Sequence, residues 1–444
     1  MLVCPVCADE AMVEIVTEPT ESPSLFFVGD VAKIDDSWDS LPLDPAVQSF
    51  IDEADFALAN LEGSLPTGDA ISKQGPNLEI DRTTLTRLDQ MGFDGVSLAN
   101  NHVMDFGVEG MRSTLDACQE VGLDTVGAGE DSRDAIDPIR CEIDGTSVGV
   151  FAVSEHEELN ATNSTPGTCW VRTAGISATI QQKTSEFDVT IVVAHGGIEY
   201  IPIPPPSWRR LLRGFAELDI DAVIGHHPHC PQGWEIYEDT PICFSLGNFM
   251  MVSSNRPATH RSIGVGLSIG ETGPPSFSVT PFEISNKQVT YISKEHATQF
   301  VDYLNQLNKV LENHQDSQHY WQSVVNALFE RKYEYKFSEY GRGGLSSLIS
   351  HPLLTLDRLT RGCTGDCVEI ERSQAILDTI SNESHRAVVR SMLNDRLSNH
   401  HQELSASDNE LLEQYYRYYD GKEIPPWRVR QLNRFKTLLT RLSR

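Results

Sequence analysis

The sequence predicts an α/β layered fold, and three observations support this prediction. Short apolar runs rich in Val, Ile and Phe recur from residue 24 to 292, as buried strands do. Amphipathic stretches separate the earlier runs, and such alternation is typical of α/β proteins. Helix-like segments without apolar runs follow. We therefore predict a poorly ordered N-terminal segment over 1–23, an α/β domain over 24–292 and a helical C-terminal extension over 293–444.

Six apolar runs are expected to form buried strands. In chain order they are SLFFVGD (24–30), FALANLE (56–62), GVSLANNH (95–102), SVGVFAVS (147–154), VTIVVAHGG (189–197) and DAVIGHHPH (221–229). The later runs follow one another closely without helices between them; they cover 240–250, 262–270, 276–284 and 288–293. We expect these later runs to form antiparallel strands that complete the sheets.

Helical spacing of apolar residues marks the remaining elements. Residues 108–122 and 207–220 are expected to be helices between strands, and the first ends at Gly122, a typical residue just past a helix C-terminus. In the extension, amphipathic helices are predicted over 297–314 and 320–337, and one or two more over 373–401. No repeat or chemical motif is found in the extension.

The last 24 residues hold seven Lys or Arg and one Glu. Two interpretations fit this basic tail. It could contact anionic lipid or an acidic partner, which would place the protein at the periphery of a membrane. Alternatively, it is a solvated helix whose charge faces the acidic body of the same protein.

The net charge of −29 is spread along the whole chain. A diffuse acidic surface argues against nucleic acid as a partner. It is typical of a salt-adapted, halophilic source, although an ordinary acidic cytoplasmic protein also fits. No apolar run reaches the roughly 18–20 residues that span a bilayer, and no basic-then-apolar signal precedes the first strand. We expect a cytoplasmic protein without a transmembrane segment.

The nine cysteines form no regular framework, which points to a reducing compartment. Cys4 and Cys7 have half of a zinc-ribbon spacing. Their only candidate partners, Cys363 and Cys367, are distant in sequence and more widely spaced. Two free thiols near the N-terminus are the alternative interpretation.

Polar residues that can bind a metal follow five of the predicted strands. They are Asp30, Asn60 with Glu62, Asn100 with Asn101 and His102, His195, and finally His226 with His227 and His229. Sites in open α/β sheets form at the carboxyl ends of the strands, so these side chains are expected at one rim. Taken singly, each has a structural explanation: Asp30 as a turn or N-cap residue, Asn101 as a loop former, His195 as a core histidine.

Together these residues supply two carboxylates, an asparagine carbonyl and at least three imidazoles. Such a mixed nitrogen and oxygen set suits Mn, Fe or Zn. One or two divalent ions are expected. A carboxylate that bridges two ions would make a two-metal centre, which clamps phosphoryl oxygens and activates water.

The order and wording of these motifs resemble the CapA family, the capsule-synthesis or poly-γ-glutamate biosynthesis domain related to calcineurin-like metallophosphoesterases. The resemblance rests on GDV, ANLE, SLANNHVMDFG, AHGGIEY, VIGHHPHCPQGWEIY and FSLGNF, and it covers about residues 24–290. It implies a four-layer α/β/β/α metallophosphoesterase-like sandwich for the α/β domain.

The resemblance also implies roles for individual residues. Asp30 would bind the first metal, Glu62 would bridge, and Asn101 and His195 would bind the second metal. The paired histidines His227 and His229 would bind one metal each. His102 would protonate the leaving group or steady the phosphoryl oxygens. Substrate contact or support of the ligands would fall to Asn60, Glu199, Tyr200, His226 and Asn248; hydrogen bonds within loops are the alternative for all of these except His226.

Three features depart from the pattern or extend it. The superfamily usually has a histidine two residues after the first aspartate, and here that position is Ala32. The bridging acid is Glu62 in NLE, not an aspartate. Asp105 is expected to cap the helix that follows it, and a functional role is the alternative.

Two functions of different class are therefore predicted. The first is a CapA-like metal-dependent hydrolase or phosphoesterase that acts on a phosphorylated or anionic polymer-related substrate in capsule or poly-γ-glutamate synthesis. The second is a non-catalytic accessory subunit of a membrane-bound polymer synthase. Ala32 and the helical extension favour the second interpretation.

Overall fold

The computed structural model describes residues 2–3, 14–15, 23–33, 43–73, 75–155, 159–251, 257–270, 273–285, 288–292, 294–328, 388 and 391. The four cysteines of the hypothetical zinc site and the basic tail lie outside these residues, as does most of the helical region predicted over 373–401.

The larger sheet contains ten strands within the described ranges. Its parallel part consists of β3 (Leu25–Val31), β4 (Phe56–Leu61), β5 (Gly95–Ser97) and β6 (Asp124–Val126), in that order. An antiparallel part continues from the other side of β3, with β16 (Arg261–Ser268), β17 (Ser276–Ser285) and β18 (Gln288–Tyr291). The short strands β1 (Leu2–Val3), β2 (Glu14–Ile15) and β15 (Asn248–Met250) complete it.

The smaller sheet contains six strands within the same ranges. Four are parallel neighbours: β9 (Thr146–Ser154), β11 (Val189–His195), β12 (Ala222–His226) and β14 (Thr240–Cys243). The edges are the antiparallel strands β8 (Ile139–Ile143) and β13 (Trp234–Tyr237). Two further short strands, β7 (Ala128–Gly129) and β10 (Gly167–Thr168), pair with each other.

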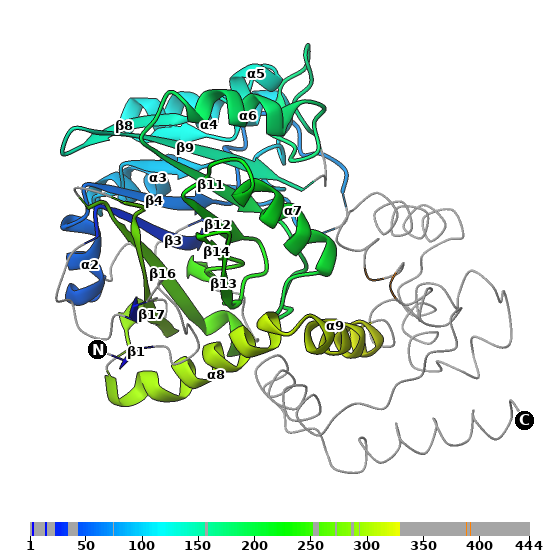
Figure 1. Ribbon diagram of the computed structural model, residues 1–444. Coiled ribbons are helices and arrows are strands. Elements are labelled where there is room, and N and C mark those ends of the chain that lie inside the picture. The colour runs from blue at the N-terminus through cyan, green and yellow to red at the C-terminus, as the bar shows by residue number, and fades with distance from the viewer. Residues whose placement is uncertain are drawn as a thin grey trace, which may run out of the picture.

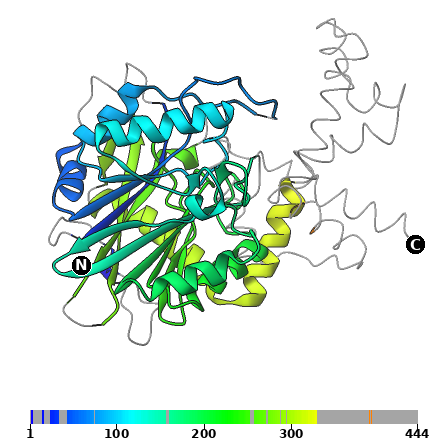
Figure 2. The same ribbon diagram turned by 90° about the horizontal axis from the view of Figure 1, so that it is seen from above.

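Helices cover the outer face of each sheet (Figures 1 and 2). The larger sheet packs against α2 (Pro45–Asp52), α3 (Arg82–Gln90) and α4 (Gly107–Val121). The smaller sheet packs against α6 (Ile176–Thr184) and α7 (Pro206–Ala216), with the short α5 (Ser132–Ala135) nearby. A third apolar cluster fills the space between the two sheets. The predicted four-layer α/β/β/α arrangement is confirmed.

The apolar runs explain why these layers form. In β3, Leu25 and Phe27 belong to the cluster between the sheets, whereas Phe26 and Val28 belong to the cluster under the helices. In β11, Ile191 likewise faces the other sheet. Successive side chains of a strand point to opposite faces, so a strand covered on both sides needs a continuous apolar run.

Two helices follow the sheets. The first, α8 (Lys294–Glu312), buries Phe300 and Leu304 in the cluster between the sheets and contacts both β13 and β17. The second is α9 (His314–Leu328). Arg209 of α7 joins both helices to the domain. Its buried guanidinium pairs with Glu235 and donates to the carbonyl of Leu311 in α8 and to the hydroxyl of Ser317 in α9. Within the described ranges no helix combines the length and apolar character needed to cross a bilayer.

The prediction of antiparallel strands is only partly correct for the run at 240–250, because β14 pairs antiparallel with β13 but also has a parallel neighbour. This run divides between the sheets: β14 lies parallel to β12, and β15 lies parallel to β3. The connecting residues bond to both sheets, with Leu246 N–H donating to Gly225 O at 3.1 Å and Asp30 N–H to Gly247 O at 2.9 Å. A Cβ at Gly29 would lie 2.0 Å from Gly247 O, so this close approach requires glycine.

The other predicted elements agree with the structure where it describes them. The helix predicted over 108–122 is α4, and Gly122 follows it in the left-handed conformation, with φ of 97°. The helix predicted over 207–220 is α7. The first helix predicted in the extension is α8, and α9 begins earlier than the second prediction.

Candidate metal centre

The polar residues predicted at the strand ends lie together at one edge of both sheets. Asp30 pairs in register with Asn60 at the ends of β3 and β4. His195 pairs with His226 at the ends of β11 and β12. Since these strands are parallel within each sheet, their carboxyl ends share one edge, and the site draws side chains from both sheets.

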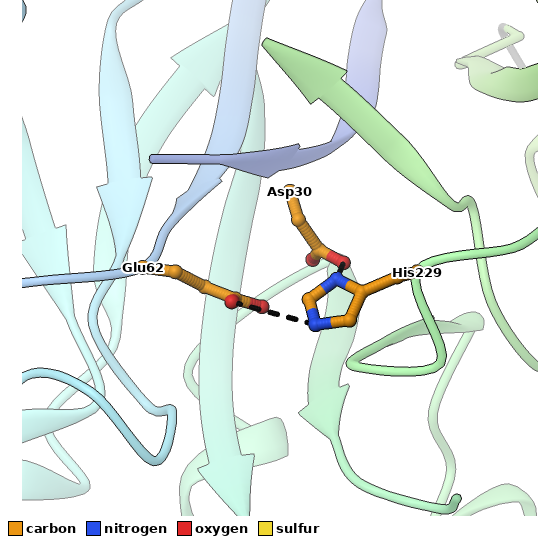
Figure 3. A group of neighbouring side chains, drawn as sticks. All are labelled: Asp30, Glu62 and His229. Atoms are coloured by element: carbon orange, nitrogen blue, oxygen red, sulfur yellow. Dashed lines mark hydrogen bonds and ion pairs between the residues drawn. The ribbon is translucent and has the colours of Figure 1, made fainter. Parts of the chain in front are cut away.

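Asp30, Glu62 and His229 form a buried cluster of two carboxylates and an imidazole (Figure 3). One potential ligand atom from each residue lies within 4.8 Å of those of the other two. His229 Nδ1 is 3.1 Å from Asp30 Oδ2, and His229 Nε2 is 3.8 Å from Glu62 Oε2. Ala32 has no side-chain ligand atom, and its backbone N–H donates to Met250 O.

A second group of donor atoms surrounds Nε2 of His195. Asn101 Oδ1 lies 3.2 Å from it, His227 Nδ1 lies 3.1 Å from it, and Glu62 Oε1 lies 3.8 Å from it. Ligands that bind one transition-metal ion at about 2.0–2.2 Å are themselves about 3 Å apart. The separations around His195 therefore fit a shared ion. Glu62 directs one carboxylate oxygen toward each group.

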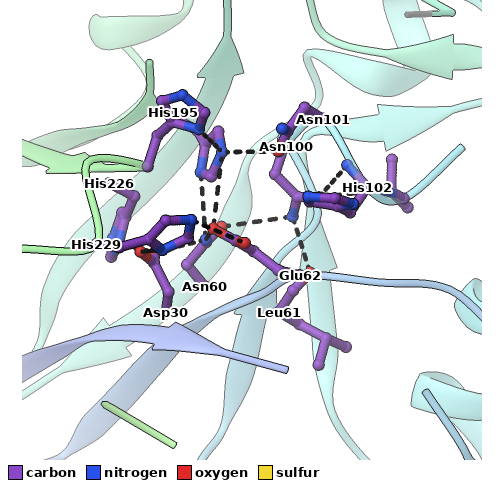
Figure 4. A network of polar contacts seen from close by, with 12 residues as sticks. Asp30, Asn60, Leu61, Glu62, Asn100, Asn101, His102, His195, His226 and His229 are labelled. Carbon is purple, nitrogen blue, oxygen red and sulfur yellow. Dashed lines mark hydrogen bonds and ion pairs between the residues drawn. The ribbon is translucent and has the colours of Figure 1, made fainter. Parts of the chain in front are cut away.

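Asn60 connects the two groups (Figure 4). Its Nδ2 lies 2.8 Å from Asp30 Oδ1, 3.4 Å from Glu62 Oε1 and 3.2 Å from His195 Nδ1. A neutral amide supplies hydrogen-bond donors to buried carboxylates without adding charge. Asn60 thus fixes side chains of both sheets relative to one another.

The loop after β5 carries Asn101 and His102. The side chain of Asn100 shapes this loop: its Oδ1 accepts from the backbone N–H groups of His102 and Val103 at 3.0 and 3.1 Å. Its Nδ2 donates to Leu61 O at 2.8 Å. This local bonding to the backbone makes a tight turn, which holds Asn101 near His195.

The expectation that Asp105 caps the following helix is wrong. The helix α4 begins at Gly107, and its N-cap residue, Phe106, makes no side-chain capping bond. Asp105 instead lies with Oδ2 2.7 Å from Nδ1 of His102 and accepts the backbone N–H of Leu78 at 2.6 Å. Because an ionised carboxylate only accepts, this contact assigns a hydrogen to Nδ1 of His102.

Burial and neighbouring charges set the ionisation of the centre. Burial raises the pKa of Asp30, but hydrogen bonds from His226 and His229 outweigh it and hold this pKa well below its usual range. Burial, together with nearby His227, lowers the pKa of His195 well below its usual value. Burial also opposes charge on His229, yet Glu62 and the hydrogen bond to Asp30 raise its pKa to about 10. At neutral pH, His195 is therefore neutral and His229 is protonated.

Three residues near the centre have a left-handed backbone. The φ angles are 63° at Tyr200, 97° at His227 and 55° at His229. For residues other than glycine such conformations cost about 1–3 kcal/mol each and cluster at functional sites. Tyr200 N–H donates to Pro228 O at 2.7 Å, and its ring lies 5.6 Å from that of His229. The loop after β11, which carries Tyr200, and the loop after β12, which carries His227 and His229, are therefore in direct contact.

The other predicted residues surround the ligand groups. His226 is fully buried, with Nδ1 3.3 Å from Asp30 Oδ1. Asn248 is also fully buried, and its Oδ1 lies 3.0 Å from His229 Nδ1. Glu199 is half-buried, and its charge contributes to the raised pKa of His229.

Two residues at the centre were not singled out as site residues from the sequence. Glu155 follows β9, is buried and accepts Gly197 N–H at 2.9 Å. Its position directly after an apolar run is the same signal that marked Asp30 and His195. Lys73 lies beside His102 in an irregular segment, and neither spacing nor periodicity marks it.

The donor set fits divalent transition metals. The two groups combine imidazole nitrogens with carboxylate and amide oxygens, the mixture that Mn, Fe and Zn accept. Two acids and several histidines are buried together here, and bound cations would offset the cost of burying the carboxylates.

Residues 24–253 match the family model described as bacterial capsule synthesis protein PGA_cap. The chain is 30% identical over 226 residues to the PGA biosynthesis protein CapA of Bacillus subtilis, covering 50% of this chain and 59% of that protein. It is 28% identical over 257 residues to the capsule biosynthesis protein CapA of Bacillus anthracis, covering 55% and 62%. The chain thus spans about three fifths of the length of these relatives. A solved hypothetical protein from Thermus thermophilus superposes with a TM-score of 0.40 at 16% identity, covering 58% of this chain and 98% of that one.

Proposed function

Since the chain belongs to the bacterial capsule synthesis protein family PGA_cap, we propose that it is a metal-dependent hydrolase of the phosphoesterase type. Its proposed role is in the synthesis of a capsule or poly-γ-glutamate polymer, as the names of the two Bacillus relatives suggest. The proposed substrate is phosphorylated or otherwise anionic. The main support is the position of Glu62, whose two carboxylate oxygens face two separate groups of donor atoms.

Each group of donors is proposed to hold one divalent ion. The first comprises Asp30, Glu62 and His229, and the second comprises Glu62, Asn101, His195 and His227. When bound, such ions withdraw charge from phosphoryl oxygens and lower the pKa of water. In this proposal His226, Asn60 and Asn248 orient the ligands by hydrogen bonding or close contact.

His102 is the proposed general acid. Asp105 holds the hydrogen on its Nδ1, so Nε2 is the nitrogen proposed to exchange a proton with a leaving oxygen. The contact also fixes the ring plane, as a carboxylate does for other catalytic histidines. Glu199 and Tyr200 are half-buried beside His229 and are proposed to contact the substrate.

The test is metal binding combined with hydrolysis. Metal-stripped protein is titrated with Mn²⁺ and assayed with a generic phosphomonoester and phosphodiester, beside Asn101→Ala and His102→Ala variants. His260→Ala is the matched control, because this partly exposed residue lies in the 3-10 helix Pro257–His260. We expect stoichiometric Mn²⁺ and turnover that falls at least 100-fold in His102→Ala. Less than one Mn²⁺ bound per protein, or turnover in both Asn101→Ala and His102→Ala equal to that of the wild type, would refute the proposal.

A non-catalytic accessory subunit is the second candidate. Ala32 supports it, since the first group has three donors without the expected histidine. In this case the protein would bind metal without turnover and would recover a membrane-bound synthase in a pull-down. Loss of that recovery on deletion of residues 421–444 would assign the docking to the basic tail. A pull-down without any membrane partner would count against this candidate.

A further inference from the structure

Lys73 is a buried cation at the edge of the candidate centre. Its side chain is 5% exposed, and its ammonium forms an ion pair with the fully buried carboxylate of Asp105. Nζ also donates to the backbone carbonyl of Asn101 at 3.1 Å and lies 3.1 Å from Nδ1 of His102. One amine therefore contacts the two consecutive residues proposed as metal ligand and general acid.

The hydrogen bonds around Asp105 are consistent with this arrangement. His102 uses its Nδ1 hydrogen for Oδ2 of Asp105, so the ammonium has no acceptor on that ring nitrogen. The hydrogens of Lys73 are instead available for Oδ1 of Asp105 and the carbonyl of Asn101. The Asp105 carboxylate thus accepts from both His102 and Lys73. Lys73 also donates to the backbone carbonyl of Asn101, so it connects the Asp105–His102 pair to the loop that carries Asn101.

Lys73 is not needed to attach its own segment to the domain. Backbone groups already do so, because Ile71 N–H donates to Asp105 O at 2.9 Å and Leu78 N–H donates to Asp105 Oδ2. Thr67 also donates to Glu109 O of α4 at 3.1 Å. Burying an ammonium is costly, and the contacts that the amine adds are those to Asn101, His102 and Asp105.

We propose that Lys73 is a positioning residue of the metal centre, acting through Asn101 and His102. It holds the Asn101 backbone so that the amide oxygen stays beside His195, and it holds Asp105 so that the His102 ring keeps its orientation. This inference rests on the proposed function, because it assigns Asn101 as a ligand. Outer partners of metal ligands typically change metal affinity by about 10–100-fold when they are removed.

The experiment compares Mn²⁺ affinity by calorimetry in wild type and Lys73→Met. Lys33→Met is the matched control, since Lys33 pairs with Glu79 of the same segment and both side chains are exposed. We expect Mn²⁺ binding about 10–100-fold weaker in Lys73→Met and unchanged in Lys33→Met. If Lys73 acts through Asn101, Lys73→Met adds no further loss to Asn101→Ala. Additive losses, or wild-type affinity in Lys73→Met, would overturn the inference.

Two further measurements separate folding and function from positioning. If Lys73→Met unfolds because Asp105 is left as a lone buried charge, the double variant Lys73→Met/Asp105→Asn removes both charges and should fold, with Mn²⁺ affinity still reduced. If the wild type binds no Mn²⁺, the proposed function fails. Amide hydrogen exchange in the metal-free protein then tests separately whether Lys73 holds the loop of Asn101 and His102 in place. Exchange at His102 and Val103 at least tenfold faster in Lys73→Met supports the positioning role, and unchanged exchange overturns it.

Discussion

His229 should make metal binding strongly dependent on pH. Its pKa is about 10 in the metal-free protein because of Glu62 and Asp30, despite burial. A metal ion needs the neutral imidazole, so binding must release the His229 proton. At pH 7, three units below this pKa, the release costs about 4 kcal/mol, from about 1.36 kcal/mol per unit. Asp30 and His195 add no such cost, since their lowered pKa values leave both unprotonated already.

Mn²⁺ affinity should therefore rise about tenfold per pH unit, or about 300-fold from pH 6.0 to 8.5. Calorimetry in two buffers of different ionisation enthalpy would measure the affinity and count the protons released, and one proton per ion at the first group is expected. His229→Gln is the control, because it removes the ligand and the proton together and should bind weakly with a flat pH dependence. An affinity that stays constant across this range, or binding without proton release, would refute the reasoning.

Three other predictions concern single side chains and stability. Asn60→Leu removes the amide between Asp30 and His195, so calorimetry should show Mn²⁺ binding about 10–100-fold weaker; an unchanged affinity would exclude the connecting role. Gly29→Ala should lower the free energy of unfolding, measured by urea titration, by about 1–3 kcal/mol or prevent folding altogether, because its Cβ would clash with Gly247 O. The control Gly214→Ala in α7 has open space around the added Cβ and should be neutral or stabilising. Without metal, protonated His229 stabilises the folded state, because its pKa is about 10 there and near 6.5 in the unfolded chain. This stabilisation is complete below pH 6.5 and is lost as the pH rises through about 10. The Tm of the wild type should therefore fall more between pH 7 and 10 than the Tm of His229→Gln.

The sequence predicts the sheets well because buried parallel strands have a simple signature. Each central strand is covered on both faces, so its residues form a continuous apolar run that ends where the strand leaves the core. The run at 240–250 shows the limit of this signature. Its apolar character predicts burial, but which sheet each half joins depends on the tertiary contacts of Gly29 and Gly225.

The strand ends also explain how much of the site is predictable. Asp30, Asn60 and His195 directly follow or end apolar runs, and parallel topology then brings them to one edge. Asp105 and Lys73 could not be assigned in this way, because they lie in irregular segments whose backbone path is set by contacts distant in sequence. His227 and His229 reach different partners from His226 because their φ angles are positive, and a positive φ at a residue other than glycine cannot be read from the sequence.

Residues 244–247, between β14 and β15, set the distance between the two sheet edges that carry the centre. This stretch bonds to the smaller sheet through Leu246 and to the larger sheet through Gly247, one residue apart. An insertion or deletion of a single residue here would shift one sheet edge by about 3.3 Å, more than a metal–ligand bond length. The length of this stretch therefore constrains the distance between the two groups of donor atoms, and Asn248, which follows it, contacts His229 of the first group. Any change in the proposed metal preference is therefore expected through substitutions at the rim and not through changes in the length of this connection.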